Sequence, residues 1–248
     1  MTTFARTAPA FLHRRNPVAK LAAGLVVAAA ALAARDPVTP ALLLVGCLVA
    51  LPLTGLGPAA LARRTAGVLL GALSVGLANA LFGSPGGWAV GGALAMRVLA
   101  IALPGVLMLS TTDPTDLADS LVQQLRAPAR FAYGSLAALR LLPLLATEWQ
   151  TIGLARRARG VSSGGNPVIA VRLLFGRVFT LLVGAIRRAS RIAAAMDSRG
   201  FDSRLPRTYA RQQTVGGTDV LLLLVAVSLA VAATAVSIAV GSWQPLVS

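Results

Sequence analysis

The chain has 248 residues, of which 56% are hydrophobic and only 12% are charged, whereas soluble domains carry about 25% charged residues. Its net charge is +15, and almost all of the positive charge is arginine, because Lys20 is the only lysine. Basic nucleic-acid-binding domains interleave cations with aromatic residues, but only 5% of these residues are aromatic. The composition therefore indicates an integral membrane protein and argues against a nucleic-acid partner.

The chain has a single lysine, a single histidine and a single cysteine, and this scarcity excludes several kinds of catalytic or metal site. A phosphate-binding P-loop needs a lysine after a glycine-rich turn, and Lys20 stands between Ala19 and Leu21 with no such turn before it. His13 is the only histidine and Cys47 the only cysteine, so a His/Cys metal cluster, a disulfide within the chain or a Cys–His catalytic pair cannot form. We expect no cofactor and no enzymatic activity of the chain's own.

Five apolar segments are each long enough to approach the roughly 20 residues that a membrane-spanning helix needs. In chain order they are 18–34, 40–56, 66–82, 88–109 and 217–240. The connections between the first four are short and rich in Gly and Pro, so neighbouring spans are expected to be antiparallel. The sequence predicts an all-α, polytopic membrane protein with about five transmembrane helices.

The distribution of arginine predicts the orientation of these spans, because basic residues gather in cytoplasmic segments. Four cations precede or open the first span and two lie in the second loop, whereas the first loop has Arg35 offset by Asp36 and the third has no charge. Residues 110–216 contain fifteen arginines and six acidic residues, a net charge of +9. We therefore expect a cytoplasmic N-terminus, a membrane bundle over 1–109, a cytoplasmic module over 110–216 and a last span within 217–248.

Helix signals within 110–216 are strong. Asp113 followed by Pro114 is typical of a helix start. From 136 to 159 and from 168 to 199, apolar residues recur at three- and four-residue steps, which predicts two long amphipathic helices. The apolar stretch 173–186 contains Arg177 and is expected to be interfacial or buried, and the segment 131–147, with Arg140 and Pro143, remains ambiguous. Six or seven crossings therefore stay open.

Two matching helix ends stand out within this module. Ala158-Arg159-Gly160 and Ser198-Arg199-Gly200 each place an arginine on the last helical turn and a glycine directly after it. The helix dipole favours a cation at that position, and glycine readily adopts the left-handed conformation that ends a helix. A single such end is commonly only a good C-cap, but two after long amphipathic patterns predict a pair of arginines presented at helix tips for a partner.

Arg97 lies near the middle of the fourth apolar segment, where an unpaired charge is costly. One interpretation is that its charge is satisfied by a carbonyl, an acid or the membrane surface. The other is that Arg97 helps to position the cytoplasmic module, and the first interpretation is favoured. Small residues in the spans allow helices to approach closely or offer a smooth docking face. These residues are Gly67, Gly71, Gly76, Gly91 and Gly92.

Taken together, these motifs resemble the transmembrane T component of energy-coupling factor transporters, along nearly the whole chain. Those that carry the resemblance are Leu12-His13-Arg14 with Asn16-Pro17 and Lys20, Thr111-Thr112-Asp113-Pro114, Leu139-Arg140-Leu141-Leu142-Pro143, Ala155-Arg156-Arg157-Ala158-Arg159-Gly160, and Ala195-Met196-Asp197-Ser198-Arg199-Gly200-Phe201. The last two are the most specific, and Ser198 departs from the alanine that is usual in the family.

The resemblance implies a non-enzymatic subunit in a prokaryotic cell membrane, with two cytoplasmic coupling helices that end in the paired arginine motifs. These motifs would dock two ABC-type ATPases, while a separate small membrane protein captures the substrate. The substrate would be a vitamin or a metal ion, such as biotin, thiamine or its precursor, cobalt or nickel. Asp113, Pro114, Arg140 and Pro143 would be structural residues of the coupling module.

Two other classes of function remain as alternatives. A self-contained secondary carrier or channel would need ionisable groups at the membrane midplane and an internal repeat, and only Arg97 fits that description. A membrane-embedded enzyme would need clustered His, Cys or acidic residues within the spans, and the sequence has none. A scaffold that works with partner subunits is the function we expect.

Overall fold

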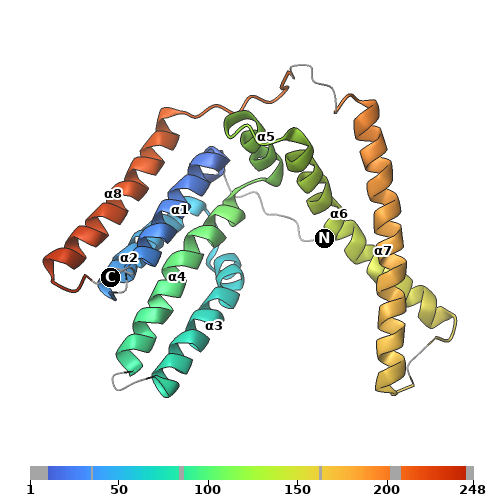
Figure 1. The fold of residues 1–248 in the computed structure, drawn as a ribbon, viewed down its shortest axis with the longest axis horizontal. Helices are drawn as coiled ribbons and strands as arrows, with labels where there is room; N and C mark the ends of the chain where they lie inside the picture. Colours follow the sequence, from blue (N-terminus) through green and yellow to red (C-terminus); the bar gives the residue numbers. More distant parts are fainter. Residues whose placement is uncertain (1–10, 35, 84–86, 162–163, 202–207, 244–248) are drawn as a thin grey trace. The chain divides into compact units, whose positions relative to one another are not determined.

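The computed structural model describes residues 11–34, 36–83, 87–161, 164–201 and 208–243, and these residues form helices without any β-strand. This confirms the all-α class. The elements are η1 Phe11–Arg14, α1 Pro17–Ala33, α2 Val38–Ala50, η2 Leu51–Thr54, α3 Pro58–Phe82, α4 Gly87–Thr111, α5 Pro114–Gln124, α6 Ala129–Ala158, α7 Pro167–Ser198 and α8 Gly217–Ala239. The chain divides into two compact units, with boundaries after residues 120 and 212 (Figure 1).

The first unit contains a bundle of α1, α2, α3, α4 and α8, and we call it the membrane bundle. Contacts between helix ends show that successive helices alternate in direction. η1, before α1, contacts η2, after α2, and Arg64 near the start of α3 donates to the carbonyl of Ser110 at the end of α4. α8 lies beside α1 and runs parallel to it, because both ends of the two helices are joined. Alternation of this kind is what five successive crossings require.

The lengths of the helices differ from the expected spans in two respects. Four helices are long and apolar enough to cross a membrane, namely α3, α4, α7 and α8, whereas α1 and the combined α2 and η2 are shorter. At 1.5 Å per residue, α1 is about 26 Å long, slightly less than a hydrocarbon core of about 30 Å. α7 meets the same criterion because its helix continues without a break through Arg177 for 32 residues. Length and composition alone therefore do not separate α7 from a span.

Small and branched side chains from four helices build the core of the membrane bundle. Ala23, Val27 and Ala31 of α1 meet side chains of α2, α4 and α8. Those side chains are Leu43 and Cys47 of α2, Ala100, Leu103 and Leu107 of α4, and Ala226 and Ala233 of α8. Alanine at so many contact positions lets helix backbones approach closely, which is how helices associate where lipid removes the hydrophobic driving force.

α3 packs against α4 through glycine, in addition to the contact of Leu61 with this core. A Cβ on Gly76 would lie 2.9 Å from the Cβ of Ala95 and 3.0 Å from the carbonyl oxygen of Gly91, and a Cβ on Gly91 would collide with the backbone of α3. These two glycines therefore serve internal packing. Gly67, Gly71 and Gly92 are different, because a Cβ at any of them would have no atom of the described residues within 4 Å outside its own helix backbone and sequence neighbours.

Lys20, Arg97 and the already described Arg64 donate to carbonyls at helix C-termini, which lack partners within their own helix. Lys20 is buried and its Nζ lies 2.9 Å from the carbonyl oxygen of Thr111, the last residue of α4. Arg97 donates through Nε to the carbonyl of Ala31 at 3.0 Å and through Nη2 to that of Leu32, both in the last turn of α1. Arg97 thus meets carbonyls, and its charge is placed where the dipole of α1 favours it.

Polar contacts tie α8 to both ends of α1. At one end, the buried Asp219 accepts from the backbone N–H of Asn16 at 3.0 Å and from that of Gly216 at 2.9 Å. At the other end, Asp36 accepts from the hydroxyl of Ser237 at 2.7 Å and from the N–H and hydroxyl of Thr39. Burial raises the pKa of Asp36, but the hydrogen bonds from Ser237 and Thr39 outweigh it and leave the pKa lowered.

Candidate functional site

The candidate site is built on α6 and α7 of the second unit. Asn166 starts α7, because its side-chain oxygen accepts from the backbone N–H groups of Val168 and Ile169 and Pro167 occupies the first helical position. α6 continues through Pro143, which removes one backbone donor without ending the helix. The segment 131–147, which the sequence leaves ambiguous, therefore belongs to a single 30-residue helix.

The end of α6 has the hydrogen bonds of a Schellman motif. Gly160 has a φ of 75°, and its N–H donates to the carbonyl of Arg157 at 2.9 Å. The N–H of Val161 donates to the carbonyl of Arg156 at 3.0 Å. This pattern satisfies the last carbonyls of the helix and requires a left-handed residue, which glycine supplies without strain.

The end of α7 repeats this geometry almost without change. Gly200 has a φ of 73° and donates to the carbonyl of Asp197 at 2.9 Å, while the N–H of Phe201 donates to that of Met196 at 3.1 Å. Backbone angles of the two arginines agree as well, with φ and ψ of −88° and 9° at Arg159 and of −90° and 12° at Arg199. The two ends are structurally equivalent.

Both arginines are exposed, and within the described part of the chain neither guanidinium has an acceptor. All five N–H donors of each group remain available to another molecule. Ser198 does not disturb this arrangement, because its hydroxyl donates to the carbonyl of Ala195 within α7 at 3.0 Å. The helix end that contains Ser198 therefore has the same backbone hydrogen bonds as the one that contains Ala158.

α6 and α7 are antiparallel and cross each other (Figure 1). The first turn of α6 meets the end of α7, where the Tyr133 and Phe201 rings lie edge to face at 5.9 Å and Arg130 pairs with Asp197 at 3.7 Å. Since α7 alone is about 48 Å long, Arg159 and Arg199 are far apart, at opposite ends of the helix pair. They do not form one compact site.

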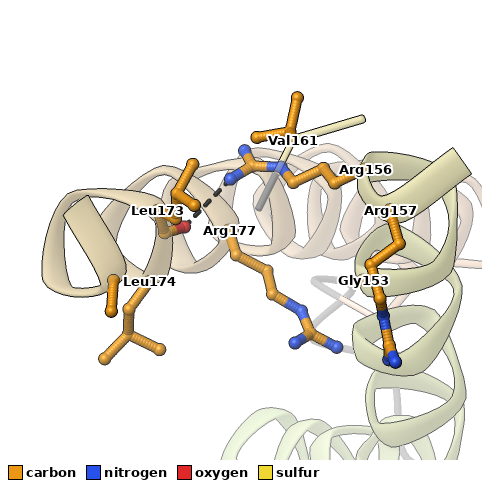
Figure 2. Close-up of a pocket in the computed structure, with 8 residues that line it drawn as sticks. Gly153, Arg156, Arg157, Val161, Leu173, Leu174 and Arg177 are labelled. Atoms are coloured by element: carbon orange, nitrogen blue, oxygen red, sulfur yellow. Dashed lines mark hydrogen bonds between the residues drawn. The ribbon is translucent and has the colours of Figure 1, made fainter. Parts of the chain in front are cut away.

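Reciprocal contacts between arginine and glycine hold the crossing together. Arg156 of α6 lies over Gly176 of α7, where a Cβ would be 3.2 Å from its guanidinium, and it donates to the carbonyl of Leu173 at 2.9 Å (Figure 2). Arg177 of α7 lies over Gly153 of α6, where any Cβ would collide with its guanidinium.

Arg177 is held there by Trp149. Its Nε lies 2.9 Å from the carbonyl oxygen of Trp149, its Nη2 donates to the same oxygen, and its guanidinium carbon lies 4.0 Å from the centre of the Trp149 ring. A cation over an indole ring gains a further electrostatic attraction. The arginine therefore contributes both charge-assisted hydrogen bonds and a stacked contact to the crossing.

One ion pair completes the contact between the two helices. Arg188 lies 3.0 Å from Glu148, both side chains are partly buried, and a Cβ on Gly184 would be 3.0 Å from the Glu148 carboxylate. By contrast, Arg130 and Asp197 are about 60% exposed, and an ion pair in water contributes little. The crossing is thus fixed mainly by Arg156, Arg177 and Glu148.

The remaining predicted residues lie as follows. Asp113 accepts from the backbone N–H of Thr115 at 2.7 Å and Pro114 is the first residue of α5, so the expected helix start is confirmed. Arg140 is an exposed residue of α6, three positions before Pro143. Ala158 is the last residue of α6 and is exposed next to Arg159.

The residues that hold the crossing were not among those predicted from the sequence. Gly153, Gly176 and Gly184 lie inside long helices, where glycine is less favourable than alanine by about 1 kcal/mol. A glycine inside a helix often marks a place where another part of the protein approaches closely, and here the approaching groups are the side chains of Arg156 and Arg177. The sequence contains these glycines, but it does not show which helix packs against which.

The chain matches known proteins over most of its length. The model of the CbiQ family, described as cobalt transport protein, matches residues 9–210. The energy-coupling factor transporter transmembrane protein EcfT of Limosilactobacillus fermentum is 34% identical over 143 residues, which make up 54% of each chain. The proteins of the same name from Staphylococcus aureus and Bacillus subtilis are each 29% identical, over 56% and 58% of this chain and 54% and 58% of their own.

The chain spans about half the length of the curated relatives it matches. The family model covers far more than half of the chain, and its range includes both arginine-ended helices and the crossing between them. The chain therefore belongs to the family described as CbiQ, cobalt transport protein, and its predicted resemblance to the transmembrane component of energy-coupling factor transporters is confirmed.

Proposed function

We propose that this chain is the transmembrane coupling subunit of an energy-coupling factor importer. Two ATPase subunits hydrolyse ATP, a separate small membrane subunit captures the substrate, and this chain transmits motion between them without catalysing a reaction. The names of the relatives, which describe transmembrane proteins of energy-coupling factor transporters, support this assignment.

The observation that carries the proposal is the equivalence of the two helix ends. Arg159 and Arg199 have the same backbone angles, the same Schellman hydrogen bonds and the same exposure. The two equivalent ends lie at opposite ends of the α6–α7 pair, and α7 alone is about 48 Å long, so they suit two separate but similar partners. Each guanidinium can make two parallel hydrogen bonds to a carboxylate in a partner's groove, which a lysine could not reproduce.

In the proposed subunit, the crossed helices α6 and α7 would transmit motion from the ATPases. Closing of the two ATPases would move Arg159 and Arg199 relative to each other, and the contacts of Arg156 and Arg177 would make α6 and α7 move as rigid rods. Exposed apolar residues along α7, such as Phe175 and Phe179, leave a face for the substrate-binding subunit. The substrate is selected by that subunit and would be a vitamin or a transition-metal ion.

Reconstitution tests the proposal directly. In liposomes that contain this chain, two ATPases and a substrate-binding subunit, we expect ATP-dependent uptake that disappears when this chain is omitted. The chain alone in detergent should show neither ATP turnover nor saturable binding of vitamin or metal. If the lone chain in liposomes accumulated substrate under an ion gradient, the secondary-carrier alternative would replace this proposal.

The proposed orientation places the N-terminus and the helix pair in the cytoplasm. In a Cys47→Ala background, a cysteine at Ser84, which lies outside the described residues, should react with a membrane-impermeant maleimide in intact cells. A cysteine at the exposed Ala210 should react only after lysis. Since the basic residues of 110–216 are expected inside, labelling of position 210 in intact cells would show that the orientation is inverted.

A further inference from the structure

A pocket lies between the C-terminal part of α6 and the N-terminal part of α7, close to the crossing (Figure 2). Its volume is about 350 Å³, at the lower end of the range for small-molecule sites. Three of its lining residues are Arg156, Arg157 and Arg177, and the others are apolar or glycine: Gly153, Val161, Ala170, Leu173 and Leu174. The lining therefore combines three positive charges with an apolar wall and contains no acidic residue.

The three guanidiniums differ in how many hydrogen-bond acceptors they have within the protein. Arg156 donates to the carbonyl of Leu173 and Arg177 to that of Trp149, so both are fixed in place by the crossing. Arg157 is exposed, and no acceptor for it exists among the described residues. Figure 2 shows the side chains of Arg157 and Arg177 extending in the same direction in this view. Positive charges that line an open pocket without an acidic neighbour attract an anion.

The apolar side of the pocket favours an anion that also carries an apolar group. Leu174, which lines the pocket, is 50% exposed, and it is continuous along α7 with Phe175 at 69% and Val178 at 44%. A free phosphate would use the guanidiniums and leave this surface in water, whereas an anionic lipid would cover both. Basic pockets between helices on the cytoplasmic side of a membrane commonly bind anionic lipid headgroups in this way.

We propose that this pocket binds the phosphate of an anionic phospholipid, with Arg157 as its free ligand, Arg156 and Arg177 as fixed neighbours, and the acyl chain along Leu174. The site needs none of the proposed partner subunits, but it rests on the proposed cytoplasmic position of the helix pair. A lipid held there would set the depth of the α6–α7 crossing relative to the headgroups of the bilayer.

Binding of phosphatidylglycerol by the full chain tests this proposal, measured by native mass spectrometry from detergent and in nanodiscs. Arg157→Gln is the informative variant, because Arg157 makes no contact that holds the helices together. Arg187→Gln is the matched control, since it removes the same charge from an exposed position of α7 outside the pocket. We expect Arg157→Gln to weaken phosphatidylglycerol binding about fivefold, while the control stays within about twofold of the parent.

Phosphatidylcholine and inorganic phosphate serve as the comparison probes. Neither should occupy the site at concentrations where phosphatidylglycerol does. Equal losses in Arg157→Gln and Arg187→Gln would overturn the proposal, because they would show general attraction to a basic surface. Displacement of the lipid by millimolar phosphate would overturn the lipid assignment. Loss of ATPase copurification in Arg157→Gln with lipid binding retained would also overturn it and assign the pocket to a protein interface.

Discussion

Replacing Arg159 and Arg199 together by alanine is expected to release the proposed ATPase partners from the membrane fraction and to abolish ATP-dependent uptake. Each arginine is exposed at the tip of a helix and has no acceptor within the described residues, so its removal costs the chain itself little. Truncating one partner of a buried charge pair typically costs about 2–5 kcal/mol, which is more than tenfold in affinity at each end. Copurification of tagged chain with the ATPases measures the loss.

Two comparison variants separate docking from general charge. Arg187→Ala with Arg191→Ala removes the same charge from exposed positions of α7 away from its end, and it should leave copurification unchanged. Arg159→Lys with Arg199→Lys keeps the charge but not the planar fork of donors, so it should restore docking only in part. Undiminished uptake by the double alanine variant, inserted at normal levels, would refute the role of these two ends.

Gly153→Leu is expected to separate docking from transport. A side chain at this position collides with the Arg177 guanidinium and removes it from the Trp149 carbonyl and ring. Overpacking of this kind costs about 1–3 kcal/mol, and it falls on the crossing rather than on either helix end. Uptake in reconstituted liposomes should drop at least tenfold, while the ATPases still copurify through Arg159 and Arg199.

Gly134→Leu is the matched control, because Gly134 is also in α6 and a Cβ there would contact no other helix in the described part of the chain. Both substitutions raise helix propensity by the same amount, roughly 0.8 kcal/mol, so any difference between them reports on the crossing. Normal uptake by Gly153→Leu would show that the crossing does not transmit force. Joint loss of docking and uptake would show that the crossing is needed to place the helix ends.

The helix ends are the part of the site that sequence could predict well. A Schellman motif is local: an amphipathic pattern, an arginine and then a glycine determine its hydrogen bonds within six residues. The same holds for the start of α5 at Asp113 and Pro114. The five apolar segments likewise correspond to helices, since hydrophobic length alone marks them.

Contacts between helices could not be predicted in this way. Arg97 lies mid-span in sequence, and only the short length of α1 and its position beside α4 place free carbonyls within reach. The pairing of Arg177 with Gly153 depends on the crossing of α6 and α7 at one particular height. Pro143 could equally have ended a helix, and no local residue pattern shows that α6 continues through it.

The position of α8 has a consequence for how the chain is made. α1 emerges from the ribosome first and α8 last, yet Asn16 and Asp36 at the two ends of α1 find their partners in Asp219 and Ser237. While residues 38–216 are being synthesised, the Asn16 N–H lacks its Asp219 acceptor and Asp36 lacks the Ser237 hydroxyl. Helices α1 to α4 are therefore synthesised before their α8 partner exists. The bundle can be completed only after α6 and α7, which lie between α4 and α8 in the sequence, have been translated.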